Sequence, residues 1–503
     1  MKLYIGIDFG ACNIKAVQVN SGGKVRSIKL NKDMDSKEFT PNVILYDKIK
    51  SNVEILVGPG AKNSPDDENK IWQIKPKISQ KNWSKYINSL EREVTAFEAV
   101  KNIFAWIWEI ISEKFSKVDE FDVTITAPVS FSEVQKKFIK QAAVEVGIPV
   151  TGIVTEPFAA MFSLDKFFEE EEEQTVLIFD FGGSTLDVSL FRIKNDDDDL
   201  EITELAAAGL KFGGIDIDEE IFKNIISVKF ADDLKEIFDT GSSKNVVMNE
   251  IEKIKENIFS EDGEESAQGF VVDKRGNLHT LTVTRDEINS MLDKMKIKEK
   301  IIVMLDELFD DAGIDKSEVT AVKPFGGTSM IDYFLQMLTD YFGDDIFDCE
   351  DFDKEDIYMG VATGAANYRY ITDKEGDNVT IRNVVPYSIG LCSDKIYSRL
   401  IKRNELSGFV TPKKPILISE LDKNNWRVDV YQSFSNEFDL PQNSEEVIYI
   451  GNVELNKNLY SVKDAVMFTM SADGAGHISM QFFEYQPGSD EPTLIEEKIV
   501  KVG

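Results

Sequence analysis

Residues 176–190 constrain the fold of this chain more than any other stretch. An apolar run ends at Asp180, two glycines and two hydroxyl residues follow (182–185), and Asp187 begins a second alternating run. This pattern predicts two strands joined by a tight turn, whose glycines and bare N–H groups suit a phosphate. The flanking carboxylates would repel phosphate unless a cation lay between them. The stretch therefore indicates a metal-bound phosphate, most simply a magnesium nucleotide, although an ordinary hairpin has the same pattern.

A shorter copy of this hairpin opens the chain. Residues 3–9 are mostly apolar, residues 10–13 form a turn, and residues 14–19 return as a second strand-like run. Asp8-Phe9-Gly10 and Asp180-Phe181-Gly182 repeat the same three residues at the same place in each hairpin. Such an internal repeat predicts two similar subdomains that grip one ligand from opposite sides.

Composition excludes several classes of protein and partner. The chain has 503 residues, enough for more than one domain, and its net charge of -33 repels nucleic acids and anionic membranes. The same charge disfavours self-association, so we expect a monomer. Cys12, Cys349 and Cys392 lie far apart and fit a reducing compartment, while the two histidines, His279 and His477, argue against a histidine-based site. No signal peptide and no apolar run of roughly 20 residues is visible, so we expect a cytoplasmic protein.

Helices and strands alternate between the two hairpins. Apolar spacing predicts helices over residues 94–115 and 132–146 and strands over residues 121–128 and 150–154. Glu156 then lies at a strand-to-helix corner, where a carboxylate can point into a cleft. A plain carboxylate at the start of a helix is the alternative.

The second half of the chain changes character twice. Residues 216–312 are mostly helical, and a strand over residues 319–325 ends in a glycine pair that could receive part of a nucleotide. A polar stretch over residues 371–378 reads as a linker. Short alternating runs separated by turns then continue to the end of the chain, which predicts a small all-β domain.

Together these motifs resemble the seventy-kilodalton heat-shock family of chaperones, the DnaK type. The similar stretches, in chain order, are 6–10, 124–128, 155–160, 180–187, 209–216, 319–328, 384–390 and 400–404. The resemblance implies an α/β actin-like ATPase domain (a duplicated ribonuclease H-like fold) over residues 1–372, a linker over 373–385 and a β-sandwich substrate-binding-like domain over 386–503.

The resemblance also assigns residues to the hydrolysis of ATP to ADP. Lys75 would bring positive charge to the transferring phosphate, and Glu156 would help to place water and metal. Asp8, Asp180 and Asp187 would hold hydrated Mg²⁺ or order the attacking water, which makes Asp180 catalytic as well. The residues implied to bind the nucleotide are Gly10, Ala11, Cys12, Gly182, Gly183, Ser184, Thr185, Gly213, Gly214, Glu252, Lys255, Gly326, Gly327 and Thr328. Without the resemblance, Lys75, Glu252 and Lys255 would read as surface residues.

The sequence departs from the family in the nucleotide site. Ala11 and Cys12 stand where the family has two threonines, and the lost hydroxyls predict slower hydrolysis. Glu256 and Met330 stand where the family commonly carries arginines beside the adenine, which predicts altered nucleotide affinity or selectivity.

The end of the chain departs as well. The linker lacks the leucine-rich pattern of the family, so the sequence does not predict whether the two domains are allosterically coupled. The sequence ends at Gly503, just after the β-domain, and we expect an atypical, lidless member whose peptide groove is open and exchanges quickly.

The leading functional hypothesis is an ATP-binding, slowly hydrolysing chaperone-like protein that binds extended apolar peptides and works with co-chaperones. Its groove residues would be Leu391, Ser393, Trp426 and Val428, for which plain β-sandwich core or surface is the alternative. A second hypothesis is a nucleotide-gated binding module with weak hydrolysis that docks one specific protein, as Ala11 and Cys12 favour. A sugar kinase or a filament-forming relative is disfavoured by the β-domain.

Overall fold

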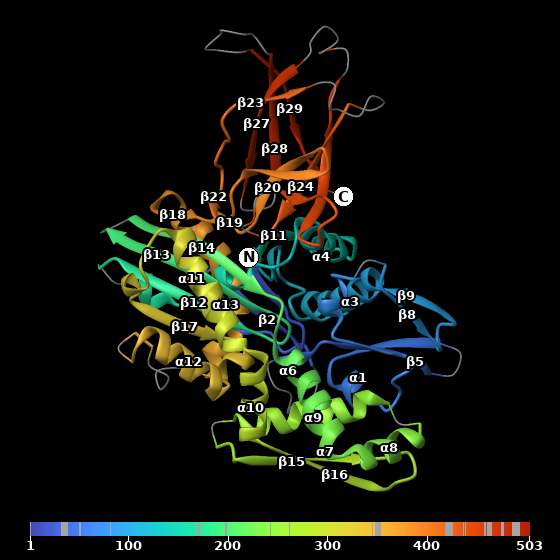
Figure 1. Cartoon of the computed structure of the whole chain (residues 1–503). Coiled ribbons are helices and arrows are strands. Elements are labelled where there is room, and N and C mark those ends of the chain that lie inside the picture. Colours follow the sequence, from blue (N-terminus) through green and yellow to red (C-terminus); the bar gives the residue numbers. More distant parts are fainter. Residues whose placement is uncertain are drawn as a thin grey trace.

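The computed structural model shows two lobes and a β-domain above both (Figure 1). Residues of both lobes line a cleft between them. It describes residues 2–31, 39–49, 52–80, 82–168, 172–196, 199–241, 243–260, 262–344, 346–347, 354–417, 426–435, 437, 439–456, 459, 465–473, 477–484 and 493–502. Cys349 lies outside these ranges.

Each lobe is built on a sheet that contains one of the two predicted hairpins, which are thereby confirmed. The first sheet has the order β11-β10-β1-β2-β3, with β4 paired to β2, and the second has the order β17-β12-β13-β14-β18. In both sheets the first hairpin strand pairs in parallel with one neighbour and antiparallel with its hairpin partner. The strands are β1 (Lys2–Phe9), β2 (Asn13–Asn20), β3 (Val25–Ser27), β4 (Thr40–Pro41), β10 (Glu120–Ala127), β11 (Val150–Thr155), β12 (Gln174–Phe181), β13 (Leu186–Asp196), β14 (Asp199–Leu210), β17 (Ala321–Phe325) and β18 (Val379–Arg382).

The first lobe adds helices and small sheets that frame one wall of the cleft. Thr95 caps the long helix α3 by accepting a hydrogen bond from the backbone N–H of Glu98. The apolar residues of this helix, among them Ile103, Phe104 and Ile107, are buried against the sheet. This confirms the long helix expected near residues 94–115. The elements are β5 (Val43–Ile49), β6 (Asn52–Val57), β7 (Lys70–Trp72), β8 (Ser84–Ile87), β9 (Arg92–Thr95), α1 (Pro59–Asn63), α2 (Ile74–Lys77), α3 (Ala96–Lys114), α4 (Glu133–Glu145) and α5 (Glu156–Met161).

The second lobe carries a helical insertion that forms the opposite wall. Helix α9 packs on the two-stranded sheet β15–β16 through a shared apolar core that includes Ile251, Ile254 and Val271. The elements are α6 (Gly214–Ile221), α7 (Ser227–Lys229), α8 (Ala231–Asp239), α9 (Lys244–Ile258), β15 (Ser266–Val272), β16 (Leu278–Thr284), α10 (Arg285–Met295), α11 (Ile297–Ala312), α12 (Asp332–Phe342) and α13 (Lys354–Glu375).

Helix α13 joins the lobes and packs on β1 and α5 at backbone distance. A Cβ atom on Gly364 would overlap the carbonyl of Ala159 and lie 3.1 Å from the backbone nitrogen of Ser163. Because both obstacles are backbone atoms, they cannot rotate away as a side chain could. The glycine therefore fixes how closely the helix approaches α5.

Gly364→Ala is expected to lower the free energy of unfolding by about 3 kcal/mol, because α13 must shift to admit the methyl group. Urea denaturation of the full chain measures the change. Gly152→Ala on β11 is the matched control, since a Cβ there meets nothing within 4 Å. Equal stability of the two variants would show that the α13 contact is not tight.

The β-domain consists of two sheets that share an apolar core. Their orders are β25-β21-β20-β24-β26-β30 and β23-β27-β28-β29, with a short β19–β22 pair at the base. The core includes Ile389, Val430, Ile450 and Met480. The strands are β19 (Val384–Val385), β20 (Ser388–Ser393), β21 (Ile396–Ile401), β22 (Glu405–Leu406), β23 (Lys414–Leu417), β24 (Arg427–Ser433), β25 (Leu440–Pro441), β26 (Val447–Glu454), β27 (Ala465–Ala472), β28 (Ile478–Glu484), β29 (Leu494–Ile499) and β30 (Lys501–Val502).

The expected linker is ordered. Its first residues complete α13, and β18 pairs in parallel with β14, so this segment extends the sheet of the second lobe. Buried polar contacts then seat the β-domain on both lobes: the Tyr387 hydroxyl donates to Glu133 at 2.6 Å, and the Val384 N–H donates to Glu204 at 3.2 Å. The domain boundaries themselves remain a prediction.

Glu204 makes this junction sensitive to pH. Burial raises the pKa of its carboxyl to about 7, from an ordinary 4.5, although the Val384 N–H and the Ser189 hydroxyl favour the charged form. Between pH 4.5 and about 7, the Glu204 carboxyl therefore keeps its proton in the folded chain but loses it in the unfolded chain. The protonated Glu204 therefore contributes to the free energy of unfolding in full below pH 4.5, the pKa of the carboxyl in the unfolded chain. This contribution is lost as the pH rises through about 7, the pKa in the folded chain.

Glu204→Gln is expected to remove this pH dependence and to stabilise the chain relative to the native protein by about 2 kcal/mol at about pH 8, with little effect at about pH 4. Thermal or urea unfolding at both pH values measures it. Glu201→Gln, three positions earlier on β14 and half-exposed, is the control. A native chain with the same pH profile as the Glu204 variant would contradict the assignment.

Candidate functional site

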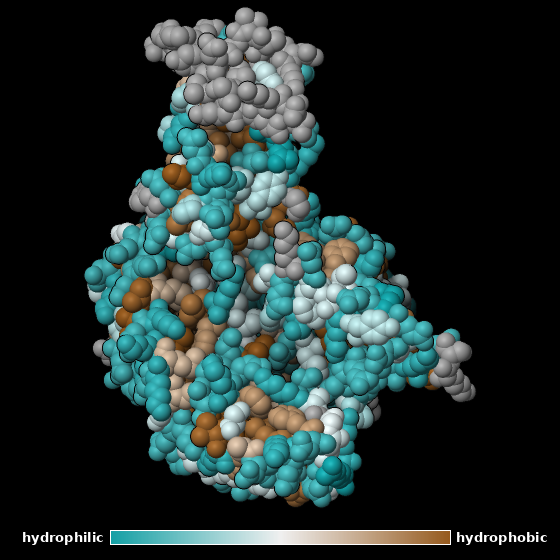
Figure 2. Space-filling view, turned by 45° about the vertical axis from the view of Figure 1, so that its right-hand side comes forward, coloured by the Kyte–Doolittle hydropathy of each residue, from teal (hydrophilic) through white to brown (hydrophobic). Residues whose placement is uncertain are grey.

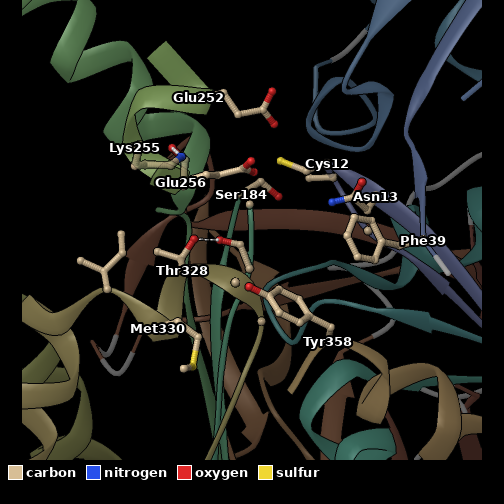
Figure 3. A pocket seen from close by; sticks show the side chains of 18 of the residues that line it. Cys12, Asn13, Phe39, Ser184, Glu252, Lys255, Glu256, Thr328, Met330 and Tyr358 are labelled. Atoms are coloured by element: carbon tan, nitrogen blue, oxygen red, sulfur yellow. Dashed lines mark hydrogen bonds between the residues drawn. The ribbon is translucent and has the colours of Figure 1, made fainter. Parts of the chain in front are cut away.

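A cavity of about 1170 Å³ lies between the lobes and is lined by both hairpin turns (Figure 3). The surface around it is largely hydrophilic, and the molecule is hollowed below the β-domain (Figure 2). Asp8 lies one residue before the end of β1, and Asp180 lies one residue before the end of β12; both residues line the cavity. The repeat therefore places its two aspartates in one site.

Two lysines and three carboxylates form the floor of this cavity, and a fourth carboxylate lies just beneath it. Lys75, in the short helix α2, pairs with Glu156 at the start of α5. Lys15 on β2 pairs with Asp8 at 2.9 Å. Asp180 and Asp187 complete the group, and all four acids are nearly inaccessible to solvent. Counting formal charges, -4 + 2 leaves the cluster at -2.

The pKa values reflect this crowding. Burial, followed by the charges of Asp187 and Asp8, raises the pKa of Asp180. Burial likewise raises the pKa of Glu156, against the attraction of Lys75. Burial opposes charge on Lys75 too, but the surrounding carboxylates outweigh it and raise the pKa of its ammonium. The site therefore favours an additional positive charge, either a proton or a cation.

A hydrated divalent cation fits these residues. A divalent cation carries a charge of +2, which would neutralise the formal charge of -2 on the cluster. In addition, the buried Oδ2 of Asp187 has no hydrogen-bond partner among the described residues. Its Oδ1 accepts a bond from the Val129 N–H at 2.7 Å. Among the described residues, no three His, Cys, Asp or Glu side chains lie close enough to ligate one metal directly. Contact through water, as Mg²⁺ commonly makes, is consistent with both facts.

The glycine turns are fixed from behind. The Thr328 hydroxyl donates to the Gly182 carbonyl at 2.8 Å, and the Gly214 N–H donates to the same oxygen at 3.2 Å. A Cβ on Gly213 would lie 2.5 Å from the Ser184 nitrogen, so only glycine permits this approach. On the facing turn, the Asn42 side chain donates to the Gly10 carbonyl at 2.7 Å. These contacts fix the backbone of both turns where they line the cavity.

The structure brings nearly all of the predicted nucleotide-site residues together. Two of the predicted residues do not line the cavity: Gly213 packs behind the turn at Gly183, and Asp187 lies beneath the floor. The predicted residues that line the cavity are Asp8, Gly10, Ala11, Cys12, Lys75, Glu156, Asp180, Gly182, Gly183, Ser184, Thr185, Gly214, Glu252, Lys255, Gly326, Gly327 and Thr328.

The residues at which the sequence departs from the family pattern also line this cavity. Glu256 and Met330 both line it. Lys255, which precedes Glu256 on α9, pairs with Asp218 at 2.8 Å. Burial raises the pKa of the Cys12 thiol to about 12, so the sulfur is neutral. The first turn therefore offers neither a hydroxyl nor a thiolate at this position.

Sequence reasoning missed several residues of the site. Lys62 on α1 pairs with Glu252 on α9 at 2.7 Å and so links the two walls across the cleft. The rings of Phe39 and Tyr358 lie 6.0 Å apart at the edge of the cavity (Figure 3). Lys15 had a visible signal, because it follows Asp8 by the same seven residues that separate Asp187 from Asp180.

The four predicted groove residues lie in the β-domain, away from this cavity. Val428 is buried in the β-sandwich core, and Leu391 and Trp426 pack against that core. Ser393, at the end of β20, is exposed. The described residues therefore place three of the four in or beside the core.

Comparison with known proteins assigns the family. The model of the Hsp70 protein family matches residues 4–458, which is most of the chain, so the chain belongs to the Hsp70 family. Chaperone protein DnaK of Stenotrophomonas maltophilia (strain R551-3) is 26% identical over 434 residues, covering 80% of this chain and 64% of that protein. The chain thus spans less than two thirds of the length of this relative. Each helix within the described ranges is too short or too polar to cross a membrane.

Proposed function

We propose that this chain binds ATP and ADP with Mg²⁺ in the cavity between the lobes, hydrolyses ATP slowly, and acts as a chaperone that binds extended apolar peptide segments. The observation that carries the proposal is the buried cluster of net charge -2, placed between two glycine turns of a duplicated hairpin. Membership of the Hsp70 family and similarity to a DnaK protein support it.

Each residue of the floor has a role that follows from its charge. Lys75 neutralises a phosphate oxygen as negative charge moves there, and Glu156 holds that lysine in place. Asp180, whose pKa burial raises, can orient a water molecule and accept its proton. Mg²⁺, held through water by Asp8, Asp180 and Asp187, would neutralise phosphate charge.

Coupling to the β-domain would run through the contacts of the ordered linker. Strand β18 belongs to the sheet of the second lobe, while Tyr387 reaches Glu133 of the first lobe. A change in the angle between the lobes would therefore alter both anchors at once. Nucleotide state would then shift the population of docked β-domain.

The test is ATP turnover by the full chain with and without a denatured client, comparing the native protein with Asp180→Asn. We expect slow basal turnover, stimulation by the client, and a loss of about 100-fold or more in the variant. Turnover that Asp180→Asn leaves unchanged would contradict the assigned site. Absence of stimulation by any denatured client would count against the chaperone.

A second candidate is a nucleotide-gated binding module that hydrolyses weakly and docks one specific folded protein. Two observations favour it: the first turn has no hydroxyl, and Val428, Leu391 and Trp426 lie in or against the β-sandwich core. Tight ATP binding without client-stimulated turnover would decide for this candidate. Co-chaperones, a cytoplasmic location and a monomeric state are expectations under both.

A further inference from the structure

Lys15 lines the cavity but has no role in the function proposed above. It lies on β2 directly opposite Asp8 of β1, so both side chains leave the same face of the hairpin. Its neighbours Ile14 and Ala16 point into the core, whereas its ammonium reaches the Asp8 carboxylate at 2.9 Å and lines the cavity. Only 13% of its side chain is exposed. A lysine is rarely this buried without a partner of opposite charge.

The duplication shows what is unusual about this residue. In the second hairpin, Asp187 is opposite Asp180, as Lys15 is opposite Asp8 in the first. The two pairs are therefore equivalent in the repeat, but one is acid–acid and the other acid–base. One hairpin thus carries two carboxylates at this pair of positions, and the other carries an ammonium opposite its aspartate.

The first turn offers no other charged side-chain donor for a phosphate. Ala11 has no donor, the Cys12 sulfur is a neutral, weak donor, and the Asn13 amide, which also lines the cavity, donates without carrying a charge. The nearest charged donor along this strand is the Lys15 ammonium, which has three N–H groups and uses one of them to bond Asp8. Lys75 approaches the same floor from α2. Two lysines thus face one phosphate site.

We propose that Lys15 is a phosphate-binding residue of this site, which contacts the terminal phosphates of the bound nucleotide together with Lys75 and reduces the dependence of nucleotide binding on Mg²⁺. The inference rests on the proposed function, since it concerns the same nucleotide. When the phosphate chain enters, the ammonium shares its donors between Asp8 and phosphate oxygens. A lysine in this place does part of the charge neutralisation that the metal ion otherwise supplies.

The test is calorimetric binding of ADP and ATP to the full chain, in Mg²⁺ and in excess EDTA. We expect the native chain to lose less than about 10-fold in affinity on removal of Mg²⁺, and Lys15→Met to lose about 100-fold or more, since a charge-assisted contact is then missing. Lys15→Arg keeps the charge and should behave like the native chain. Lys24→Met, an exposed lysine beyond the same strand, is the matched control.

The outcomes separate the two proposals. Equal loss of affinity on EDTA addition in the native chain and Lys15→Met would show that Lys15 is only a counter-ion for Asp8, and this would overturn the inference alone. A Lys15→Arg variant as dependent on Mg²⁺ as Lys15→Met would overturn it too. No binding by the native chain in Mg²⁺ would overturn the proposed function with it. If Lys15→Met does not fold, Lys15→Gln, which keeps a hydrogen bond to Asp8, gives the same comparison.

Discussion

Lys75→Met is expected to lower the rate of ATP turnover by about 10²- to 10³-fold, the loss typical of removing one donor aimed at developing charge. The ammonium lies at the floor of the cavity, is almost fully buried, and is held by Glu156. In such a site no water molecule can replace its charge. Single-turnover hydrolysis with saturating ATP isolates this step from nucleotide exchange.

The matched control for this experiment is Lys77→Met. Lys77 is on the same short helix, but its ammonium lies 5.4 Å from the centre of the Trp83 ring and does not line the cavity. Its turnover should remain within about threefold of the native rate, because it touches no reacting group. Comparable rates for Lys75→Met and the native chain would show that the lysine does not face the transferring phosphate.

Gly183→Ala is expected to weaken nucleotide binding by about 100-fold, because a shift of about 1 Å in a positioned site can cost that much. The two turns approach each other here: a Cβ on Gly183 would overlap the Cys12 sulfur and lie 3.4 Å from the Cys12 Cβ. The added methyl must displace the Cys12 side chain, and this disturbs the packing of the two turns that line the cavity. Equilibrium binding of ADP in Mg²⁺ measures the loss.

A double variant tests this explanation directly. Cys12→Ala removes the sulfur that the new methyl group would meet, so Cys12→Ala with Gly183→Ala should recover most of the lost affinity. Cys12→Ala alone should bind nearly as well as the native chain, since the thiol is neutral and a weak donor. Failure of the second substitution to rescue the first would show that the loss does not arise from crowding between the turns.

The two hairpins could be predicted from the sequence because their signals are local. Alternating apolar residues, a glycine turn and a repeated Asp-Phe-Gly all fall within short stretches, and the structure confirms each hairpin. The long helix α3 was predictable for the same reason. Lys75 and Glu156 became candidates only through resemblance to a family, since neither carries a distinctive local pattern.

Contacts between distant residues could not be predicted in this way. Lys62 and Glu252 are 190 positions apart, and only the closed arrangement of both walls brings their charges to 2.7 Å. In the β-domain, alternation marks the strands but not which face is buried, because shifting the pattern by one residue exchanges the faces. Val428, expected in a groove, is therefore found in the core.

Calorimetric titration of ADP into the full chain in Mg²⁺ tests whether the cavity between the two hairpin turns binds a magnesium nucleotide. We expect one saturable site per chain, with a dissociation constant on the order of micromolar or lower, weakened about 100-fold by Gly183→Ala. Absence of saturable binding up to about 1 mM ADP, or binding that Gly183→Ala leaves unchanged, would contradict this expectation.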